Sequence, residues 1–339
     1  MNIANPSTSF QPIHNLLMGS IAAKAFYSAV ELELFNHLQE RSLTVDTLAN
    51  ELSVIPDRLE PVLDLLTASK LLTRNDGTYT NTSLANEFLT STSPCYQGKS
   101  IALTMGFCRS VENSISDLLT GKKLDRSKTD KGWATERTME GTAQEAIGDG
   151  LCEVVNYISA LPNFSNARSM CDIGGNHGLY TMGVLSQNPA LSGTIYDLPH
   201  VVNHTQKRCN EAGFEDRITA CELDFRTDPL PANEYDIILM SHALYAFKDH
   251  LPETITKVAN GLKKGGWFVS HHNAGRQEAS YEIEKSALEL ITRLSGYTSH
   301  FIEKEELIGL LKENGFHNFR THKTSNSALG LLLVAQKKT

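Results

Sequence analysis

The change of pattern at residue 167 constrains the fold of this chain most. From there to the C-terminus, short apolar runs alternate with segments whose apolar residues recur at helical spacing. The runs with the character of strands are SMCDI, GTIYDL, RITACEL, YDIILMS and GGWFVSHH. Because this alternation builds a parallel sheet with helices on both faces, we predict an α/β, Rossmann-like domain over residues 166–339.

A glycine-rich turn follows the first predicted strand. The strand ends in the segment DIGGNHG, residues 172–178, and a helix begins directly after it. Glycines in such a turn let the backbone approach a ligand closely, and these sheets bind ligands at the carboxyl ends of their strands. The turn is therefore predicted to line a ligand site.

Residues at the next two strand ends indicate the kind of ligand. Asp197 ends the second strand, about 20 residues after the glycines, where a carboxylate can accept hydrogen bonds from both hydroxyls of a ribose. Asp224 and Phe225 end the third strand, where a polar group and an aromatic ring can hold an adenine. The turn contains no Gly-Lys-Ser/Thr and lacks the G-x-G-x-x-G order that suits a pyrophosphate. These features favour a nucleoside without phosphate over NAD.

Residues 1–98 are predicted to form a mainly helical winged-helix domain. Residues 12–38 have apolar residues at helical spacing and are expected to form one long helix. Two further helices follow, and then two short strands around the hairpin signal Asn75-Asp76-Gly77. The helix over residues 12–38 carries more apolar surface than a solvent-facing helix needs, so we expect it to pack against another chain.

Charge decides between DNA binding and dimerisation for this domain. The whole chain has 31 Lys and Arg against 39 Asp and Glu, and residues 1–98 contain five basic and ten acidic residues. A DNA-binding domain needs a basic surface to offset phosphate charge, but here the third helix carries Asp57, Glu60 and Asp64. We therefore predict a homodimer formed through the N-terminal domain, with no nucleic-acid partner.

Residues 99–165 are predicted to be a helical connector that contributes to a substrate pocket. It includes a charged surface loop over residues 121–131 and a helical segment over residues 134–161. The N-terminus lacks the regions of a signal peptide, no window is apolar enough to cross a membrane, and the six cysteines form no C-x-x-C pair. We expect a cytoplasmic protein with no membrane partner and no metal.

Five segments together resemble the class I S-adenosylmethionine-dependent methyltransferases of the small-molecule O-methyltransferase type. They are DIGGNHG, IYDLPHVV, the Asp224-Phe225 pair, YDIILMSHALY and KKGGWFVS. The resemblance extends over nearly the whole chain and implies a winged-helix dimerisation domain before a mostly parallel sheet whose last strand is antiparallel. It also implies S-adenosyl-L-methionine as cofactor, with its methionine part along Gly174 and Gly175, its ribose on Asp197, and its adenine on Asp224 and Phe225. The cofactor-binding residues implied in this way are Asp172, Gly174, Gly175, Gly178, Asp197, Leu198, Asp224, Phe225 and Ser241.

The catalytic residues depart from the family pattern. In plant-type relatives the fourth strand leads to a His-Asp-Trp motif whose histidine deprotonates a phenol, and two glutamates orient that histidine. Here Tyr245 stands at the histidine position, His272 matches one glutamate, and Phe301 lies at about the position of the other. A phenol with a pKa near 10 needs a base at neutral pH, and such help is typically worth about a hundredfold to ten-thousandfold. Since tyrosine is a poor base, we expect Tyr245 to orient the acceptor, with His272 and His242 as the other catalytic candidates.

The missing base favours an acceptor atom that needs none. A thioether or thiol sulfur can be methylated largely through positioning, which can be worth roughly 7 to 11 kcal/mol. The favoured acceptor is therefore a small acid of the methylthiohydroxybutyrate type, which another relative of this family methylates. C-methylation of a tetrapyrrole-like ring is an alternative, because the bacteriochlorophyll C-20 methyltransferase of this family also has a tyrosine here, and O-methylation of a hydroxyl is another. Outside methyl transfer, the alternatives are a cofactor-sensing transcriptional regulator and an enzyme that keeps the cofactor while it catalyses a rearrangement.

Residues of the connector and of the segment before the last helix are expected to complete the substrate pocket. In relatives, the connector segments close over the site, and several histidines can converge at the carboxyl edge of the sheet. The expected pocket residues are Phe107, Trp133, Met139, Thr142, His300 and Phe301.

Overall fold

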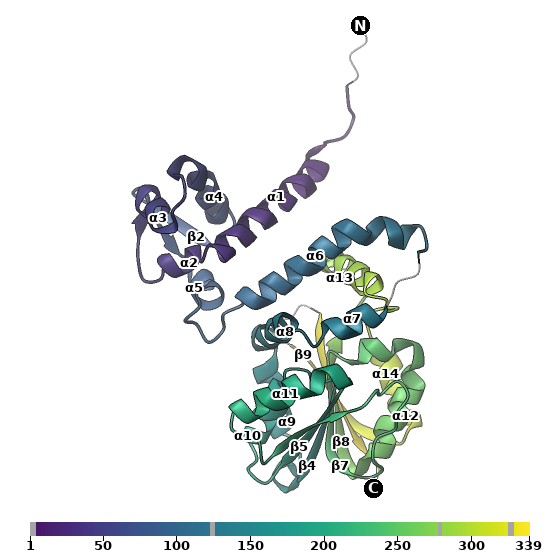
Figure 1. Ribbon diagram of the computed structural model, residues 1–339. Helices are drawn as coiled ribbons and strands as arrows, with labels where there is room; N and C mark the ends of the chain where they lie inside the picture. Colours follow the sequence, from purple (N-terminus) through teal and green to yellow (C-terminus); the bar gives the residue numbers. More distant parts are fainter. Residues whose placement is uncertain (1–4, 123–125, 277–279, 325–328) are drawn as a thin grey trace. The chain divides into compact units, whose positions relative to one another are not determined.

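The computed structural model describes residues 5–122, 126–276, 280–324 and 329–339. The chain divides into two compact units, Met1–Met105 and Gly106–Thr339. Helix α6 (Gly98–Leu119) begins in the first unit and ends in the second (Figure 1).

The first unit is a winged helix, as the sequence predicts. Its small antiparallel sheet has the order β1-β3-β2, and the hairpin between β2 and β3 turns at Asp76 (φ 47°) and Gly77 (φ 79°). Leu34, Leu48 and Leu63 are fully buried in its core. The elements are α1 (Gln11–Glu31), α2 (Leu34–His37), β1 (Leu43–Thr44), α3 (Val45–Leu52), α4 (Pro56–Ala68), β2 (Leu72–Asn75), β3 (Thr78–Asn81) and α5 (Ser83–Leu89).

The prediction of one continuous helix over residues 12–38 is wrong. The chain breaks after α1 because Glu33 adopts a left-handed conformation (φ 56°), and α2 begins at Leu34 in a new direction. The break turns Leu34 and Phe35 into the core, where they are 0% and 1% exposed. Burial of these two side chains offsets the cost of a non-glycine residue at positive φ.

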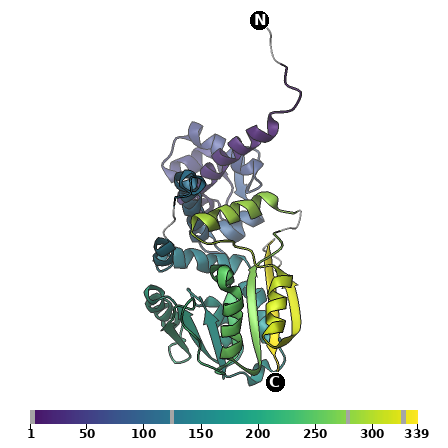
Figure 2. The same cartoon turned by 90° about the vertical axis from the view of Figure 1, so that its right-hand side faces the viewer.

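The second unit holds a seven-stranded sheet in the order β6-β5-β4-β7-β8-β10-β9. Strands β4 to β8 pair in parallel, whereas β10 is antiparallel to both of its neighbours, β8 and β9. Figure 2 shows β9 and β10, in yellow, side by side. The strands are β4 (Ser169–Ile173), β5 (Ser192–Asp197), β6 (Ile218–Glu222), β7 (Tyr235–Ser241), β8 (Leu262–Asn273), β9 (Phe316–Lys323) and β10 (Gly330–Lys337). The predicted Rossmann-like sheet with an antiparallel last strand is confirmed.

Helices cover both faces of this sheet. One hydrophobic core includes Val154 of α9, Val184 of α10 and Cys209 of α11, and a second core includes Ile255 of α12 and Leu307 of α14 (Figure 1). The helices of this unit after α6 are α7 (Arg126–Gly132), α8 (Glu136–Gly148), α9 (Leu151–Ser159), α10 (Leu179–Ser186), α11 (Pro199–Glu211), α12 (Leu251–Gly261), α13 (Glu282–Leu294) and α14 (Lys304–Glu313), with 3₁₀ turns η1 (Phe164–Asn166) and η2 (Leu244–His250).

Strand β7 shows why its apolar run forms a central strand. Ile237 and Leu239 belong to one core, whereas Ile238 and Met240 belong to the other, as the period of two in a strand requires. Because both faces are buried, the run Ile237–Met240 is apolar, and after Asp236 at the start of the strand the next polar residue is Ser241, where the strand ends. The carboxyl edge of the sheet is therefore where polar side chains gather.

Two expectations for the connector are corrected. Part of the segment predicted as a surface loop over residues 121–131 forms α7, while residues 123–125 lie outside the described residues. The segment predicted as helical over residues 134–161 is two helices, because Gly150 has φ 124° and separates α8 from α9.

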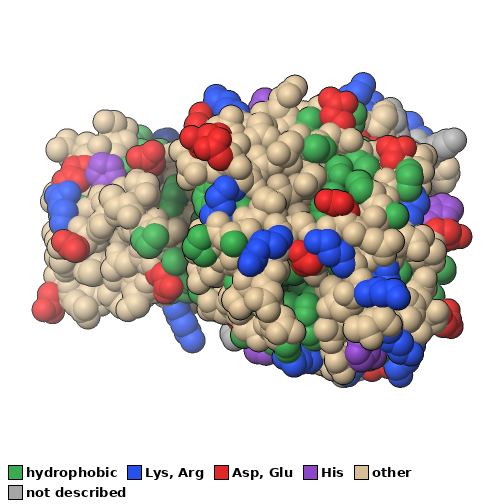
Figure 3. Space-filling view, turned by 90° about the horizontal axis from the view of Figure 1, so that it is seen from below, with side chains coloured by type: hydrophobic (Ala, Val, Ile, Leu, Met, Phe, Trp, Pro, Cys, Tyr) green, Lys and Arg blue, Asp and Glu red, His purple; other side chains and the backbone are tan. Residues whose placement is uncertain are grey.

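The surface carries charges of both signs. On the face drawn in Figure 3, Lys and Arg side chains are interspersed with Asp and Glu side chains. Both signs are abundant in the composition, with 31 Lys and Arg against 39 Asp and Glu.

Candidate functional site

The glycine turn after β4 brings backbone to the edge of the sheet. Gly174 has φ 71° and Gly178 has φ 74°, which favour glycine. A Cβ at Gly174 would lie 3.1 Å from Cβ of Ala243, and a Cβ at Gly175 would lie 2.8 Å from the Asp172 carboxylate. The turn therefore needs glycines both for its conformation and for its close contacts.

Asp172 is a buried carboxyl beneath this turn. It is 1% exposed, and the Thr181 hydroxyl donates to its Oδ2 at 2.7 Å. Its Oδ1 is buried and has no hydrogen-bond partner among the described residues. Burial raises the pKa of Asp172 to about 7. An unpartnered buried oxygen beside a backbone cradle is a feature of a site built for a ligand.

Asp197 ends β5 and faces the same turn. Its Oδ2 accepts the backbone N–H of Asn176 at 2.9 Å, and its Oδ1 accepts that of Leu198 at 2.8 Å. Burial raises the pKa of this carboxyl to about 6. Because each carboxylate oxygen has two lone pairs, both can still accept a further hydrogen bond, as two ribose hydroxyls require.

Asn176 is a site residue that the sequence analysis missed. It has φ 38°, its Nδ2 donates to the carbonyl of Trp133 at 3.2 Å, and its carbonyl accepts the Thr205 hydroxyl. Thr142, predicted to line the substrate pocket, lies with its Oγ1 3.4 Å from Oδ1 of Asn176. The tolerance of asparagine for left-handed backbone was the available signal.

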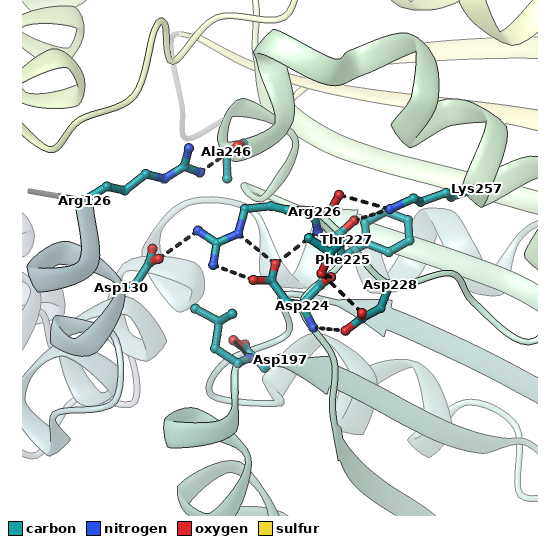
Figure 4. Close-up of polar contacts among 11 residues, drawn as sticks. Arg126, Asp130, Asp197, Asp224, Phe225, Arg226, Thr227, Asp228, Ala246 and Lys257 are labelled. Carbon is teal, nitrogen blue, oxygen red and sulfur yellow. Dashed lines mark hydrogen bonds and ion pairs between the residues drawn. The ribbon is translucent and has the colours of Figure 1, made fainter.

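The end of β6 is held by an arginine that the sequence analysis also missed. Arg226 donates from Nε and Nη2 to the two carboxylate oxygens of Asp224, at 2.7 and 2.8 Å (Figure 4). Its Nη1 donates to Oδ2 of Asp130 on α7 at 2.8 Å. Both oxygens of Asp224 thus have a cationic partner, and the Arg226 guanidinium holds the pKa of Asp224 below its ordinary value. Phe225 is buried in a hydrophobic core, with its ring edge-to-face against that of Phe247 at 5.5 Å.

Aromatic rings converge where β7 is followed by η2. The ring of Tyr245 stacks on that of His300 with centroids 4.3 Å apart, and it meets Tyr297 edge-to-face at 5.0 Å. Trp133 donates from Nε1 to the Tyr297 hydroxyl at 3.4 Å. Arg126 lies over the Tyr297 ring at 4.3 Å. It also donates to the carbonyl of Ala246 at 2.8 Å (Figure 4). Burial raises the pKa of Tyr245, so its hydroxyl stays protonated at neutral pH.

Three other histidines lie at this edge of the sheet, and burial keeps all of them neutral. The His242 ring lies 4.3 Å from the ring of His271, and its Nε2 is 3.7 Å from Oδ2 of Asp149. His271 contacts the Ser241 hydroxyl through Nδ1 at 3.3 Å. His272 is 2% exposed and contacts the Ser270 hydroxyl through Nδ1 at 2.7 Å. Burial lowers the pKa of His242 to about 4, that of His271 to about 2 and that of His272 to about 3, so all three are neutral at pH 7.

The remaining pocket candidates lie in different surroundings. Phe301 is 2% exposed and joins Asn273 through an isolated bridge, so it has almost no surface for a substrate. Met139 on α8 is also buried, and Phe107 lies on α6 with no ring contact to the other candidates among the described residues. His300 and Trp133 are the pocket candidates that meet Tyr245 or its neighbour Tyr297.

The residues at this edge fit S-adenosylmethionine. The turn at Gly174 and Gly175 presents backbone without side chains at the sheet edge, Asp172 keeps an unpartnered buried oxygen, and Asp197 presents two acceptors. His200 and His204 are four residues apart on α11, but within the described ranges no group of three His, Cys, Asp or Glu side chains could hold a metal ion.

Family profiles cover most of the chain. The profile of the O-methyltransferase domain matches residues 141–317, and the profile of the O-methyltransferase dimerisation domain matches residues 14–91. The chain belongs to the O-methyltransferase family. It is an enzyme, an S-adenosylmethionine-dependent methyltransferase that acts on small molecules. The resemblance drawn from the sequence is therefore confirmed.

Individual relatives agree with this family. The 3-hydroxy-5-methyl-1-naphthoate 3-O-methyltransferase of Streptomyces sahachiroi is 29% identical over 91% of this chain and 89% of its own length. The bacteriochlorophyllide d C-20 methyltransferase of Chlorobaculum tepidum is 24% identical over 73% of this chain and 74% of its own. Human N-acetylserotonin methyltransferase, solved in complex with S-adenosylmethionine, has a TM-score of 0.78 and 21% identity, with 99% of this chain and 100% of that chain covered.

These comparisons bear on the acceptor atom. The family description and the naphthoate relative concern oxygen acceptors, and they do not support the sulfur acceptor that the sequence analysis favours.

No helix in the described part of the chain is long and apolar enough to cross a membrane.

Proposed function

We propose that this protein transfers a methyl group from S-adenosylmethionine to a hydroxyl oxygen on a small aromatic molecule, with Nε2 of His300 as the acceptor of the hydroxyl proton. The family description and the naphthoate relative support oxygen as the acceptor atom. The observation that carries the proposal is the His300 ring, stacked 4.3 Å from the ring of Tyr245, the residue at the sequence position of the family's base.

The residues at the sheet edge would hold the cofactor. S-adenosylmethionine, when bound, supplies an electrophilic methyl group on a positively charged sulfur. Gly174 and Gly175 would lie along its methionine part and Asp197 would accept from its ribose. Because Arg226 already binds both oxygens of Asp224, we assign Asp224 a smaller share of adenine binding than the family resemblance implies.

The His300 ring can accept a hydroxyl proton, but only as a weak base. Burial lowers its pKa to about 3, so the imidazole is neutral at pH 7 and keeps a lone pair. A base of low pKa is effective only toward a relatively acidic group, and a phenol, with a pKa near 10, is acidic for a hydroxyl. We therefore infer an aromatic hydroxyl in preference to an aliphatic alcohol.

The rings around His300 suit an aromatic acceptor. Tyr245 and Tyr297 meet edge-to-face, and Trp133 is joined to Tyr297 by a hydrogen bond. Aromatic pairs of this kind add about 0.5 to 1.5 kcal/mol beyond the burial of their area, so an aromatic acceptor among these rings would gain orientation as well as affinity. Orientation matters because the acceptor oxygen has to approach the methyl group in line.

A matched set of acceptors tests the proposal. Enzyme and methyl-labelled S-adenosylmethionine would be incubated with 1-naphthol, hydroxynaphthoic acids, 1-naphthalenethiol, 1-(methylthio)naphthalene and a chlorin. We expect label on oxygen in the naphthol series, and a fall of about a hundredfold or more in turnover for His300→Gln. His204→Gln, a change of an exposed histidine on α11, is the control. Turnover confined to the sulfur compounds or to the chlorin would contradict the proposal.

We further infer that the protein acts as a homodimer through its winged-helix unit and does not bind nucleic acid. The dimerisation profile over residues 14–91 supports the first point. The second is supported by Arg74 of β2, which pairs with Glu60 and Asp64 of α4, the helix that would enter a major groove. This arginine is already neutralised within the unit.

A further inference from the structure

Thr292 is a buried threonine whose hydroxyl meets the ring of His300. It lies on α13 and is 3% exposed. Its Oγ1 is 2.8 Å from the carbonyl oxygen of Leu288 and 3.0 Å from Nδ1 of His300. Both distances lie in the range of hydrogen bonds, so a proton should lie between the two atoms of each pair.

Counting protons assigns the tautomer of His300. A carbonyl oxygen cannot donate, so the single proton of the Thr292 hydroxyl has to lie toward Leu288. The contact with His300 then needs a proton on Nδ1. The opposite arrangement would leave two oxygen atoms 2.8 Å apart with no proton between them. The His300 ring therefore carries its proton on Nδ1, and Nε2 holds a lone pair.

The same helix also holds the backbone of His300. Glu289, 6% exposed and one turn before Thr292, accepts the backbone N–H of His300 and the hydroxyl of Ser299, both at 3.1 Å. Arg276 and Arg293 each pair with the other oxygen of this carboxylate at 3.1 Å. A buried carboxylate with four partners is a rigid support, so α13 determines where the His300 ring lies.

The other nitrogen of the ring is available to a substrate. His300 is half-buried, and no described residue makes a hydrogen bond to its Nε2. Tyr245 covers one face of the ring, which leaves the edge that carries Nε2 as the place where a hydroxyl can donate.

We propose that Thr292 is a positioning residue that fixes the proton of His300 on Nδ1 and so keeps Nε2 free to accept the acceptor's hydroxyl proton. This inference rests on the proposed function for its catalytic consequence, whereas the tautomer is a property of the protein alone. Without the Thr292 hydroxyl, Nδ1–H has no partner, and the proton can move to Nε2, where it would block acceptance.

The tautomer can be measured in the ligand-free protein. Histidine labelled with ¹³C and ¹⁵N distinguishes Nδ1–H from Nε2–H by NMR, and the His300 signals are identified by their loss in His300→Gln. We expect the Nδ1–H form in the wild type, the same form in Thr292→Ser, and a rise of the Nε2–H form in Thr292→Val. Thr254→Val is the matched control, because Thr254 on α12 is also 3% exposed and its hydroxyl also donates to the carbonyl four residues earlier.

Turnover of a naphthol provides the second measurement. We expect kcat to fall about tenfold or more in Thr292→Val with little change in KM, while Thr292→Ser and Thr254→Val stay within about threefold of the wild type. A wild-type His300 that carries its proton on Nε2 would overturn the proposal, and so would an unchanged tautomer in Thr292→Val. If the tautomer shifts as expected but turnover does not change, the tautomer assignment stands and the role of His300 in the proposed function fails.

Discussion

The ring of Tyr245 lies nearly parallel to the ring of His300, with centroids 4.3 Å apart and an interplanar angle of 16°. The family resemblance implies that Tyr245 stands at the position of the histidine base of plant-type relatives, and burial raises the pKa of its phenol, so we expect no base at this residue. An imidazole from the segment before α14 lies directly against it. This contact is the reason that we propose His300 as the base.

Tyr245→Phe should leave measurable turnover. Burial raises the pKa of the Tyr245 hydroxyl, so this group stays protonated at neutral pH and we expect it not to act as a base. Removal of the hydroxyl should cost less than about tenfold in kcat, whereas an essential base would cost about a hundredfold to ten-thousandfold. Tyr245→Ala is the comparison, because loss of the ring also removes its contacts with His300 and Tyr297. A loss of a hundredfold in Tyr245→Phe, with substrates still bound, would show that the hydroxyl takes part in the chemistry.

Asp197→Ala should weaken the binding of S-adenosylhomocysteine. A charged acceptor of hydrogen bonds is worth roughly 1.5 to 3 kcal/mol, and here it also anchors the N–H groups of Asn176 and Leu198. Calorimetric titration measures the affinity, and thermal unfolding of the ligand-free variant shows how much of the effect is structural. Asp216→Ala changes an exposed carboxylate and is the control. An affinity equal to that of the wild type would mean that the ribose lies elsewhere.

The first unit should form the dimer through α1. Apolar side chains of this helix are left in solvent in the single chain, among them Ile13 (53% exposed), Leu16 (67%) and Ile21 (55%). Light scattering should give twice the 37.4 kDa mass of one chain, and Leu16→Glu should shift the protein toward a monomer. Ile283→Glu, at an exposed apolar position of α13, should leave the dimer intact. A monomeric wild type at micromolar concentration would refute this prediction.

Asp172 should make stability fall as pH rises from about 4 to about 7. Its pKa is about 7 in the folded chain against an ordinary value of 3.8, so between these values the folded chain holds a proton that the unfolded chain has lost. Stability contributed by the protonated form is present at low pH and is lost as pH rises to 7, by roughly 1.4 kcal/mol per pH unit. Urea unfolding of the wild type and Asp172→Asn from pH 5 to 8 measures this: the stability of the wild type relative to the variant should decline up to about pH 7 and level off above it. A constant difference between the two would show that the pKa of Asp172 is not raised.

The sequence predicted those structural elements that depend on the pattern of neighbouring residues. Alternating apolar runs predicted the sheet, and DIGGNHG predicted a turn that the structure builds with Gly174 and Gly178 at positive φ. The Asn-Asp-Gly segment predicted the hairpin of the winged helix. Errors arose where one residue changes the backbone direction, at Glu33 and Gly150. A left-handed conformation at a single position depends on what its neighbours bury, and helical spacing does not carry that information.

The sequence by itself determined the family, the sheet and the strand ends from which the candidate site is built, because the period of a strand and the composition of a turn are properties of neighbouring residues. Only the tertiary structure decided which side chains meet there. The contacts of His300 with Tyr245 and of Arg226 with Asp130 join segments far apart in the chain. The contact of His300 with Thr292 spans only eight residues, but it joins α13 to the segment that follows it. Such contacts depend on how α7 and α13 pack. Burial in the folded chain, rather than residue type, lowers the pKa of His300 and raises that of Asp172.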